Sequence, residues 1–276
     1  MKQLFISYLF KLRHDITFKI TLIVCAALAV FMSLLYFGLS FLIEASMVSG
    51  EMMVVTSLSP VQNFGIAVPV NLITFTVLEF NQGGIRNKII GGHSKGKIYT
   101  SIFLNGLIFS FVLMTIYVLL NFAFGSAFGA ILNNIHPEYQ AATGIYGEYY
   151  ILKMIILAVV CYISIVSFTV FFSTLFRNIG PSIPVVIISL MFCYLAGSII
   201  SLAGVENETL LWVGRIIDPL YCLGASENIM EASGGATIMT TDIKNETFYS
   251  GIASNIFYAT IFFIGGLVIF KKRDIK

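Results

Sequence analysis

The chemically richest part of this sequence is one short segment, Glu79–Ser101, which reads EFNQGGIRNKIIGGHSKGKIYTS. Two long hydrophobic stretches flank it. The segment holds one carboxylate and four cationic side chains, namely Glu79, Arg86, Lys88, Lys95 and Lys97. A simple turn between two membrane helices needs none of these charges. The pattern therefore predicts a cytoplasmic surface through which another protein contacts the membrane segments.

Part of this segment is close to a nucleotide-binding loop. Residues Gly91–Ile98, GGHSKGKI, nearly match G-x-x-x-x-G-K-[ST], whose backbone N–H groups and lysine hold phosphates and whose last hydroxyl binds Mg²⁺. Here Ile98 replaces that hydroxyl, and a hydrophobic stretch precedes the loop instead of the strand of a soluble sheet. We therefore expect this chain to bind no ATP and no other cofactor.

The three histidines, His14, His93 and His136, all lie outside the hydrophobic stretches. A Ser–His pair or a His-containing metal cluster therefore cannot form inside the membrane. We expect no catalytic residue and no metal site, and hence no enzyme.

The hydrophobic stretches also lack a charged residue at mid-depth. Proton- and ion-driven transporters place such residues deep in their spans. Mild polar residues such as Asn71 and Thr74 more often join helices to one another than contact a substrate. Energy for any transport would therefore come from a partner.

The elements that position these residues are membrane helices. The chain is 58% hydrophobic and 11% charged, with a mean hydropathy of +0.91, whereas soluble domains carry about 25% charged residues. We expect one all-α integral membrane domain over 1–276, with six spans of adequate length. They are Ile20–Ile43, Val61–Phe80, Ile98–Leu132, Tyr150–Phe176, Ser182–Gly204 and Ile252–Phe270. The third is longer than one crossing needs, so either one end projects beyond the hydrocarbon or the helix is broken, with Gly125 and Gly129 as possible break points.

Charge predicts the orientation of these spans. Of the 16 Lys and Arg residues, 13 lie in 1–19, in 81–97, at Arg177 or in the C-terminal tail. The positive-inside rule places that side in the cytoplasm. Both termini are then cytoplasmic, as an even number of spans requires.

Three segments outside the spans have their own expected structure. Residues 1–19 suit an amphipathic helix on the inner membrane surface, or a positive flank that only sets topology. In 81–97, Ile85 and Ile89 share a helical face, the glycines 91 and 92 end that helix, and Ser94 can cap the next. In the external loop 205–251, the apolar run 210–222 predicts a re-entrant or interfacial segment.

Several of these residues resemble a known family. Glu79-Phe80, Gly84-Ile85-Arg86-Asn87-Lys88, Gly92-His93-Ser94-Lys95 and Ile98-Tyr99 are similar to the first cytoplasmic loop of ABC-2-type transporter permeases. That loop often reads E-x-x-x-G-T-I-R-N-K-x-x-x-G-x-S-R-x-x-I-Y. This chain has Gly84 where Thr is usual and Lys95 where Arg is usual. The segments Leu175–Asn178 and Phe270–Asp274 also look like the family.

The resemblance implies the membrane subunit of a bacterial ABC exporter with the ABC-2 fold. Two permeases, either two copies or two paralogues, would pair in the plasma membrane, and a dimer of separate ATPase subunits would carry ATP and Mg. Residues 1–19 would be the interface helix, 81–97 the coupling loop, and 210–222 the re-entrant segment. Docking would involve Glu79, Ile85, Arg86, Asn87, Lys88, Ile89, His93, Ser94, Lys97 and Tyr99.

The resemblance places the translocation path along the second and fifth spans, with Asn71, Thr74, Ser189 and Ser198 as polar candidates. An amphipathic peptide, an antibiotic or a lipid-like molecule would be the substrate. Nucleic acid is not an expected partner. Two alternatives stay open: a secondary transporter or channel that works without an ATPase, and a non-transporting immunity or sensor protein of the membrane.

Overall fold

Four helices are long and apolar enough to cross a membrane, by length and composition. A computed structural model describes residues 2–43, 48–58, 67–137, 145–146, 149–176, 179–203, 213, 227–233, 236–243 and 245–273. The four are α2 (Ile16–Ile43), α7 (Lys95–Ile135), α8 (Tyr150–Leu175) and α11 (Asn245–Lys272). They correspond to the expected first, third, fourth and sixth spans, and they make this a membrane protein.

The expected second and fifth spans coincide with two further apolar helices. These are α5 (Ala67–Asn81) and α9 (Ile179–Ala203), which has Pro184 inside it. With 15 residues, α5 extends about 22 Å, less than the hydrocarbon thickness of about 30 Å. By length and composition, the described residues confirm four of the six expected spans.

The expectation that Gly125 and Gly129 break the third span is wrong. Helix α7 runs unbroken for 41 residues, about 60 Å. A short helix, α3 (Gly50–Leu58), and the residues before it lie against these glycines. A Cβ at Gly125 would be 2.6 Å from Cγ of Met53, and one at Gly129 would be 2.8 Å from the carbonyl oxygen of Val48. The glycines thus allow close packing of two backbones.

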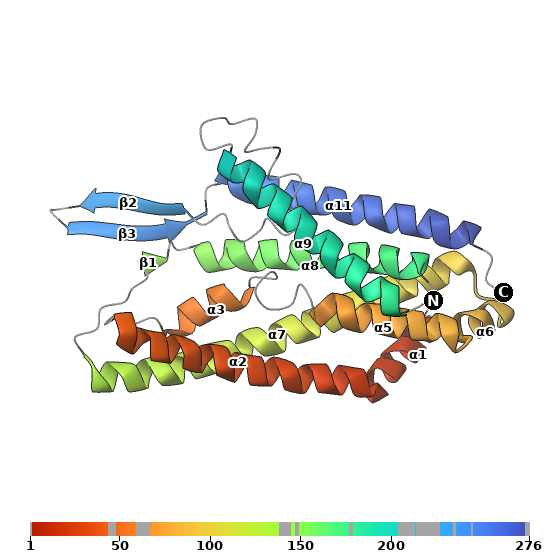
Figure 1. The fold of residues 1–276 in the computed structure, drawn as a ribbon, viewed down its shortest axis with the longest axis horizontal. Coiled ribbons are helices and arrows are strands. Elements are labelled where there is room, and N and C mark those ends of the chain that lie inside the picture. Colours follow the sequence, from red (N-terminus) through yellow and green to blue (C-terminus); the bar gives the residue numbers. More distant parts are fainter. Residues whose placement is uncertain are drawn as a thin grey trace.

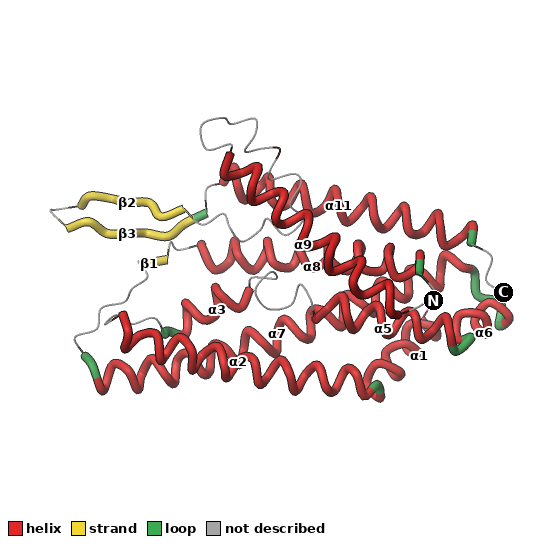
Figure 2. The backbone as a smooth tube through the Cα atoms, viewed as in Figure 1, coloured by secondary structure: helices red, strands yellow, loops and turns green. Residues whose placement is uncertain are grey.

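The long helices lie along the long axis of the molecule, and its two ends carry different elements (Figure 1). At one end, here named the α6 end, lie α1 (Lys2–His14), α6 (Gly84–Ile90) and both chain termini. At the opposite end lies a small sheet, which was not expected (Figure 2). Its strands are β1 (Ile145–Tyr146), β2 (Glu227–Ser233) and β3 (Ala236–Asp242), in the order β1-β3-β2. Strand β3 pairs parallel with β1 and antiparallel with β2.

Helix α8 is the central helix of the bundle. Of its most apolar window, 61% is buried, against 22% for α2 and 17% for α11. The main core gathers buried side chains from α1, α2, α5, α6, α7, α8 and α11. The short helices at the α6 end are therefore packed on the same core as the long ones.

Candidate functional site

The segment between α5 and α7 folds as its local signals predict. Gly83, with φ 70°, turns the chain out of α5, and α6 then runs for 7 residues. Gly91 caps α6, and Gly92 has φ 83°, a conformation that favours glycine. Ser94 occupies the N-cap position of α7, although its side chain makes no capping hydrogen bond. The expected order of short helix, glycine break and new helix is confirmed.

A buried carboxylate joins three helices at the α6 end. Glu79, on α5, is only 3% exposed and forms ion pairs with Lys11 of α1 and Lys88 of α6. The Lys88 ammonium lies 2.8 Å from Oε2 of Glu79, and the Lys11 ammonium contacts Oε1. A buried charge is costly unless it is paired and hydrogen-bonded. Glu79 meets that requirement because it is paired with one lysine of α1 and one lysine of α6.

The surroundings of Lys88 reinforce this arrangement. Its ammonium lies 3.5 Å from the centroid of the Tyr8 ring, a cation–π contact. Burial lowers the pKa of Lys88, and the Glu79 carboxylate opposes that change. Burial also raises the pKa of the Tyr8 phenol, and Glu79 raises it further. A Cβ at Gly84 would be 2.6 Å from Oε2 of Glu79, so a glycine leaves room for the carboxylate.

Two expected docking anchors point into the protein instead. Ile85 is fully buried in the main core, and Ile89 is half-buried against it. Tyr99 is also fully buried and packs on the rings of Phe263 and Phe270. Ile85 is therefore not available for the docking contact that the resemblance implies, because its helical face packs on this chain's own core.

The exposed surface of residues 84–97 carries one large apolar side chain and several polar ones. Ile90 is 74% exposed and is the large apolar side chain that α6 presents outward. The other exposed docking candidates are Arg86, Asn87, Ser94 and Lys97. Within residues 91–98, Gly91 and Gly92 follow the end of α6, and Ile98 is buried.

A cavity of about 440 Å³ lies between α1 and α6, beside the buried carboxylate. Its lining is mostly polar: Ser7, Lys11, Glu79, Gly84, Asn87, Lys88, Gly91 and His93. It brings together four residues that were expected in the docking region, namely Glu79, Asn87, Lys88 and His93. Ser7 and Lys11 were missed, although Lys11 belongs to the helical pattern of residues 1–19.

A second set of contacts ties the start of α7 to the end of the chain. The Lys95 ammonium donates to the carbonyl oxygens of Lys271, at 3.2 Å, and Arg273, at 2.7 Å. The Arg273 guanidinium donates to the carbonyl oxygen of Thr174 and lies 5.2 Å from the centroid of the Phe80 ring. These contacts hold α5, α7, α8 and α11 together.

Two of the four candidate path residues, Asn71 and Thr74, have hydrogen-bond partners within the bundle. The Thr21 hydroxyl of α2 donates to the Asn71 side-chain oxygen at 2.8 Å, and the Asn71 amide donates to Ala67 of its own helix. The Thr74 hydroxyl donates to its own backbone at Val70. Ser189 is half-buried in α9, and the side chain of Ser198 lies outside the described part. Residues 210–222, the expected re-entrant segment, are also outside it except for position 213.

These features define a helical membrane protein in which two short helices, α1 and α6, carry paired charged residues at one end of the bundle. The chain matches the family model described as "Protein of unknown function (DUF2705)" over residues 20–276, and it belongs to that family. The match includes Glu79 and Lys88 but begins after Lys11. No curated protein and no solved structure matches the chain.

Proposed function

We propose that this chain is the membrane-spanning permease subunit of an ATP-binding cassette exporter. It would move an amphipathic peptide, antibiotic or lipid-like molecule with energy from a separate ATPase dimer. The observation that carries the proposal is the fixed position of α6. This short surface helix lies between two membrane helices and is anchored by Lys88 and Ile85. An anchored surface helix can pass a partner's movement to the spans.

The proposal includes six membrane crossings with both termini in the cytoplasm of a bacterium. The crossings are α2, α3 followed by α5, then α7, α8, α9 and α11. The α6 end is the cytoplasmic end, because the described parts of the chain that lie there contain most of the Lys and Arg residues. A second copy or a paralogous permease would complete the transporter.

The docking surface that we propose differs from the one that helical periodicity predicts. Ile90 is the apolar anchor, and Arg86, Asn87 and Lys97 are the polar rim around it. Central buried contacts dominate protein interfaces, while an exposed ion pair contributes about 0.2–1 kcal/mol. Ile90 should therefore contribute more to ATPase binding than any one of the rim charges.

The test uses Ile90→Asp and a matched control, Ile135→Asp. Ile135 is 54% exposed at the other end of α7, so both changes place an acid at an exposed site. The adjacent reading frames are first searched for an ATPase with a phosphate-binding loop, and that ATPase is co-expressed with each variant. Its co-purification and the efflux of a fluorescent amphipathic peptide from vesicles are then measured.

Ile90→Asp should abolish co-purification and ATP-driven efflux while the variant still inserts in the membrane. Ile135→Asp should leave co-purification intact. Full association and full efflux with Ile90→Asp would show that α6 does not dock an ATPase, and a secondary transporter or an immunity protein would then be the better interpretation.

A further inference from the structure

A second cavity at the α6 end has a mixed lining that fits an amphipathic ligand. It has a volume of about 530 Å³ and lies between the junction of α1 with α2 and the last turns of α5. One part of its lining is polar: Lys11, His14, Asp15 and Gln82. The other part is apolar: Phe10, Ile16, Phe75 and Leu78. Small-molecule sites commonly measure about 300–1,000 Å³.

The polar wall can bind an anion. An ammonium group has three N–H donors; Lys11 uses one for Glu79, and its side chain is 41% exposed. The cluster of Lys11, Lys88 and Glu79 has a net charge of +1, so a positive charge remains beside the cavity. Gln82 is exposed and adds an amide donor.

The other two polar residues do not oppose an anion strongly. The Asp15 carboxylate already accepts the backbone N–H of Thr17, at 2.9 Å, in the first turn of α2. A helix N-terminus partly offsets such a negative charge. Nδ1 of His14 lies 2.9 Å from the Phe10 carbonyl oxygen, which can only accept, so Nδ1 carries a proton. The exposed His14 ring therefore adds no negative charge to this wall.

The apolar wall continues onto the surface of the first membrane helix. Phe10 is 64% exposed, Ile16 is 72% exposed, and Ile20 and Ile23 on α2 are 55% and 69% exposed. The cavity lies where the charged residues 1–19 give way to the apolar stretch 20–43, which is the level of the lipid headgroups. A soluble anion would occupy only the polar wall. A phospholipid would cover both walls, with its acyl chains along α2.

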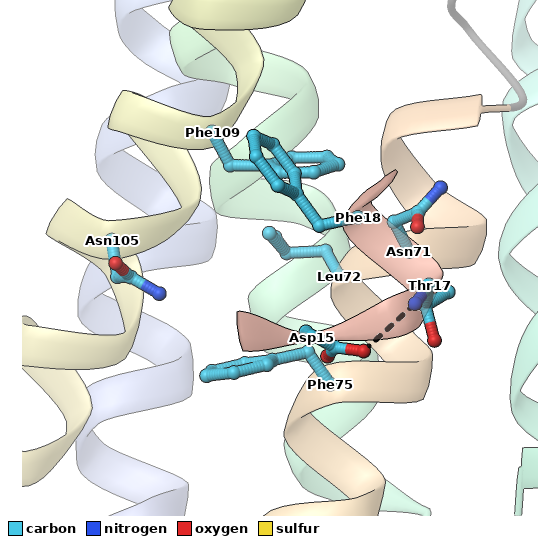
Figure 3. A pocket seen from close by; sticks show the side chains of 8 residues that line it. All are labelled: Asp15, Thr17, Phe18, Asn71, Leu72, Phe75, Asn105 and Phe109. Atoms are coloured by element: carbon cyan, nitrogen blue, oxygen red, sulfur yellow. Dashed lines mark hydrogen bonds between the residues drawn. The ribbon is translucent and has the colours of Figure 1, made fainter. Parts of the chain in front are cut away.

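A deeper cavity adjoins this one and limits how far a ligand can enter. The two share Asp15 and Phe75, and the deeper one is closed by Phe18, Leu72 and Phe109 (Figure 3). Its volume is about 20 Å³, which holds one water molecule but no acyl chain. The side-chain oxygen of Asn105 in its lining is buried and, among the described residues, has no hydrogen-bond partner. Water suits this chamber, and lipid is confined to the outer cavity.

We propose that the outer cavity, between the α1–α2 junction and α5, binds the phosphate-bearing headgroup of an anionic phospholipid. The phosphate contacts Lys11 and Gln82, and the acyl chains follow Ile16 and Ile20 along α2. Lipid binding at this site does not require that the chain is a transporter. The buried carboxylate and the lipid share Lys11, so a bound lipid also holds α1 in place.

The test measures lipid bound to the intact chain in detergent by native mass spectrometry. Phosphatidylglycerol and phosphatidylcholine are each titrated, and glycerol 3-phosphate is added as a soluble competitor. The variants are Lys11→Gln, which removes the cation, and Gln82→Trp, which fills the rim of the cavity without changing an ion pair. Lys19→Gln is the control, because Lys19 is exposed nearby and does not line the cavity.

One phosphatidylglycerol should be retained in preference to phosphatidylcholine. Lys11→Gln should weaken its binding about tenfold or more, since a hydrogen bond between charged groups contributes about 1.5–3 kcal/mol. Gln82→Trp should weaken it at least as much, and Lys19→Gln should change it little. Equal binding of both lipids, or an equal loss in Lys19→Gln, would overturn the proposal. Complete displacement by glycerol 3-phosphate would show a soluble-phosphate site instead of a lipid site.

Discussion

Replacing Glu79 by glutamine should destabilise the α6 end of the molecule. The change removes a carboxylate that is 3% exposed and leaves two cations that both contacted it. Lys88, at 18% exposure, cannot regain full hydration, whereas Lys11, at 41%, largely can. The cost should therefore arise chiefly from Lys88.

The magnitude follows from the exposure of the two lysines. Removing one partner of a fully buried ion pair costs about 3–5 kcal/mol, and an exposed pair contributes about 0.2–1 kcal/mol. Because Lys88 keeps some exposure and its contact with the Tyr8 ring, we expect a loss of about 3 kcal/mol for Glu79→Gln. For a chain of this size that corresponds to a fall in Tm of roughly 6–12 °C.

The assay is thermal unfolding in detergent, followed by size-exclusion chromatography of the heated samples. The double variant Glu79→Gln/Lys88→Met removes the buried cation as well and should recover most of the lost stability, because replacing a whole buried pair by apolar groups is close to neutral. Lys97→Gln, at an exposed position, should shift Tm by less than about 2 °C. A Glu79→Gln variant that melts with the wild type, or a double variant no better than the single one, would refute the reasoning.

Three further changes test the helix packing and the contacts at the α6 end. Gly125→Ala should lower Tm, at a cost of about 1–3 kcal/mol for overpacking, whereas Gly38→Ala should not, since among the described residues no atom lies within 4 Å of the added Cβ. Gly266→Ala would place a Cβ 2.1 Å from the Tyr99 hydroxyl oxygen, so Tyr99→Phe should partly restore its Tm. Lys95→Gln removes two donors to the last turn of α11, and limited trypsin digestion should then remove the C-terminal tail faster.

Hydrophobicity and local turn signals predicted the parts of this fold that depend on short-range physics. In a bilayer every backbone polar group needs an internal partner, so a long apolar run becomes a helix whatever its neighbours are. That is why α2, α7, α8 and α11 lie where the sequence places them. Likewise, two glycines after an apolar helical turn end α6 at Ile90 by local geometry alone.

The orientation of α6 could not be predicted in the same way. Periodicity places Ile85 and Ile89 on one face, but the pattern is the same whether that face packs on the chain itself or on a partner. The choice depends on Glu79 and on its contact with Lys11, which is 68 residues away in the sequence. A glycine in a helical stretch is ambiguous in the same way, because the sequence around Gly125 is compatible both with a helix break and with close packing of α3.

The two glycine turns around α6 determine how a movement of that helix would reach the spans. On the α5 side, the glycines at 83 and 84 make the backbone between α5 and α6 flexible. Side-chain contacts of Lys88 and Ile85 nevertheless hold α6 against α5 and α1. On the α7 side, Gly91 and Gly92 are both exposed, and the start of α7 is fastened to α11 by Lys95 instead. We therefore expect a push on α6 to reach α1 and α5 directly, through Lys88 and Ile85, and to reach α7 only through the shared core. The turn at Gly91 and Gly92 would then be the hinge, because it is the part of this segment without a charged anchor among the described residues.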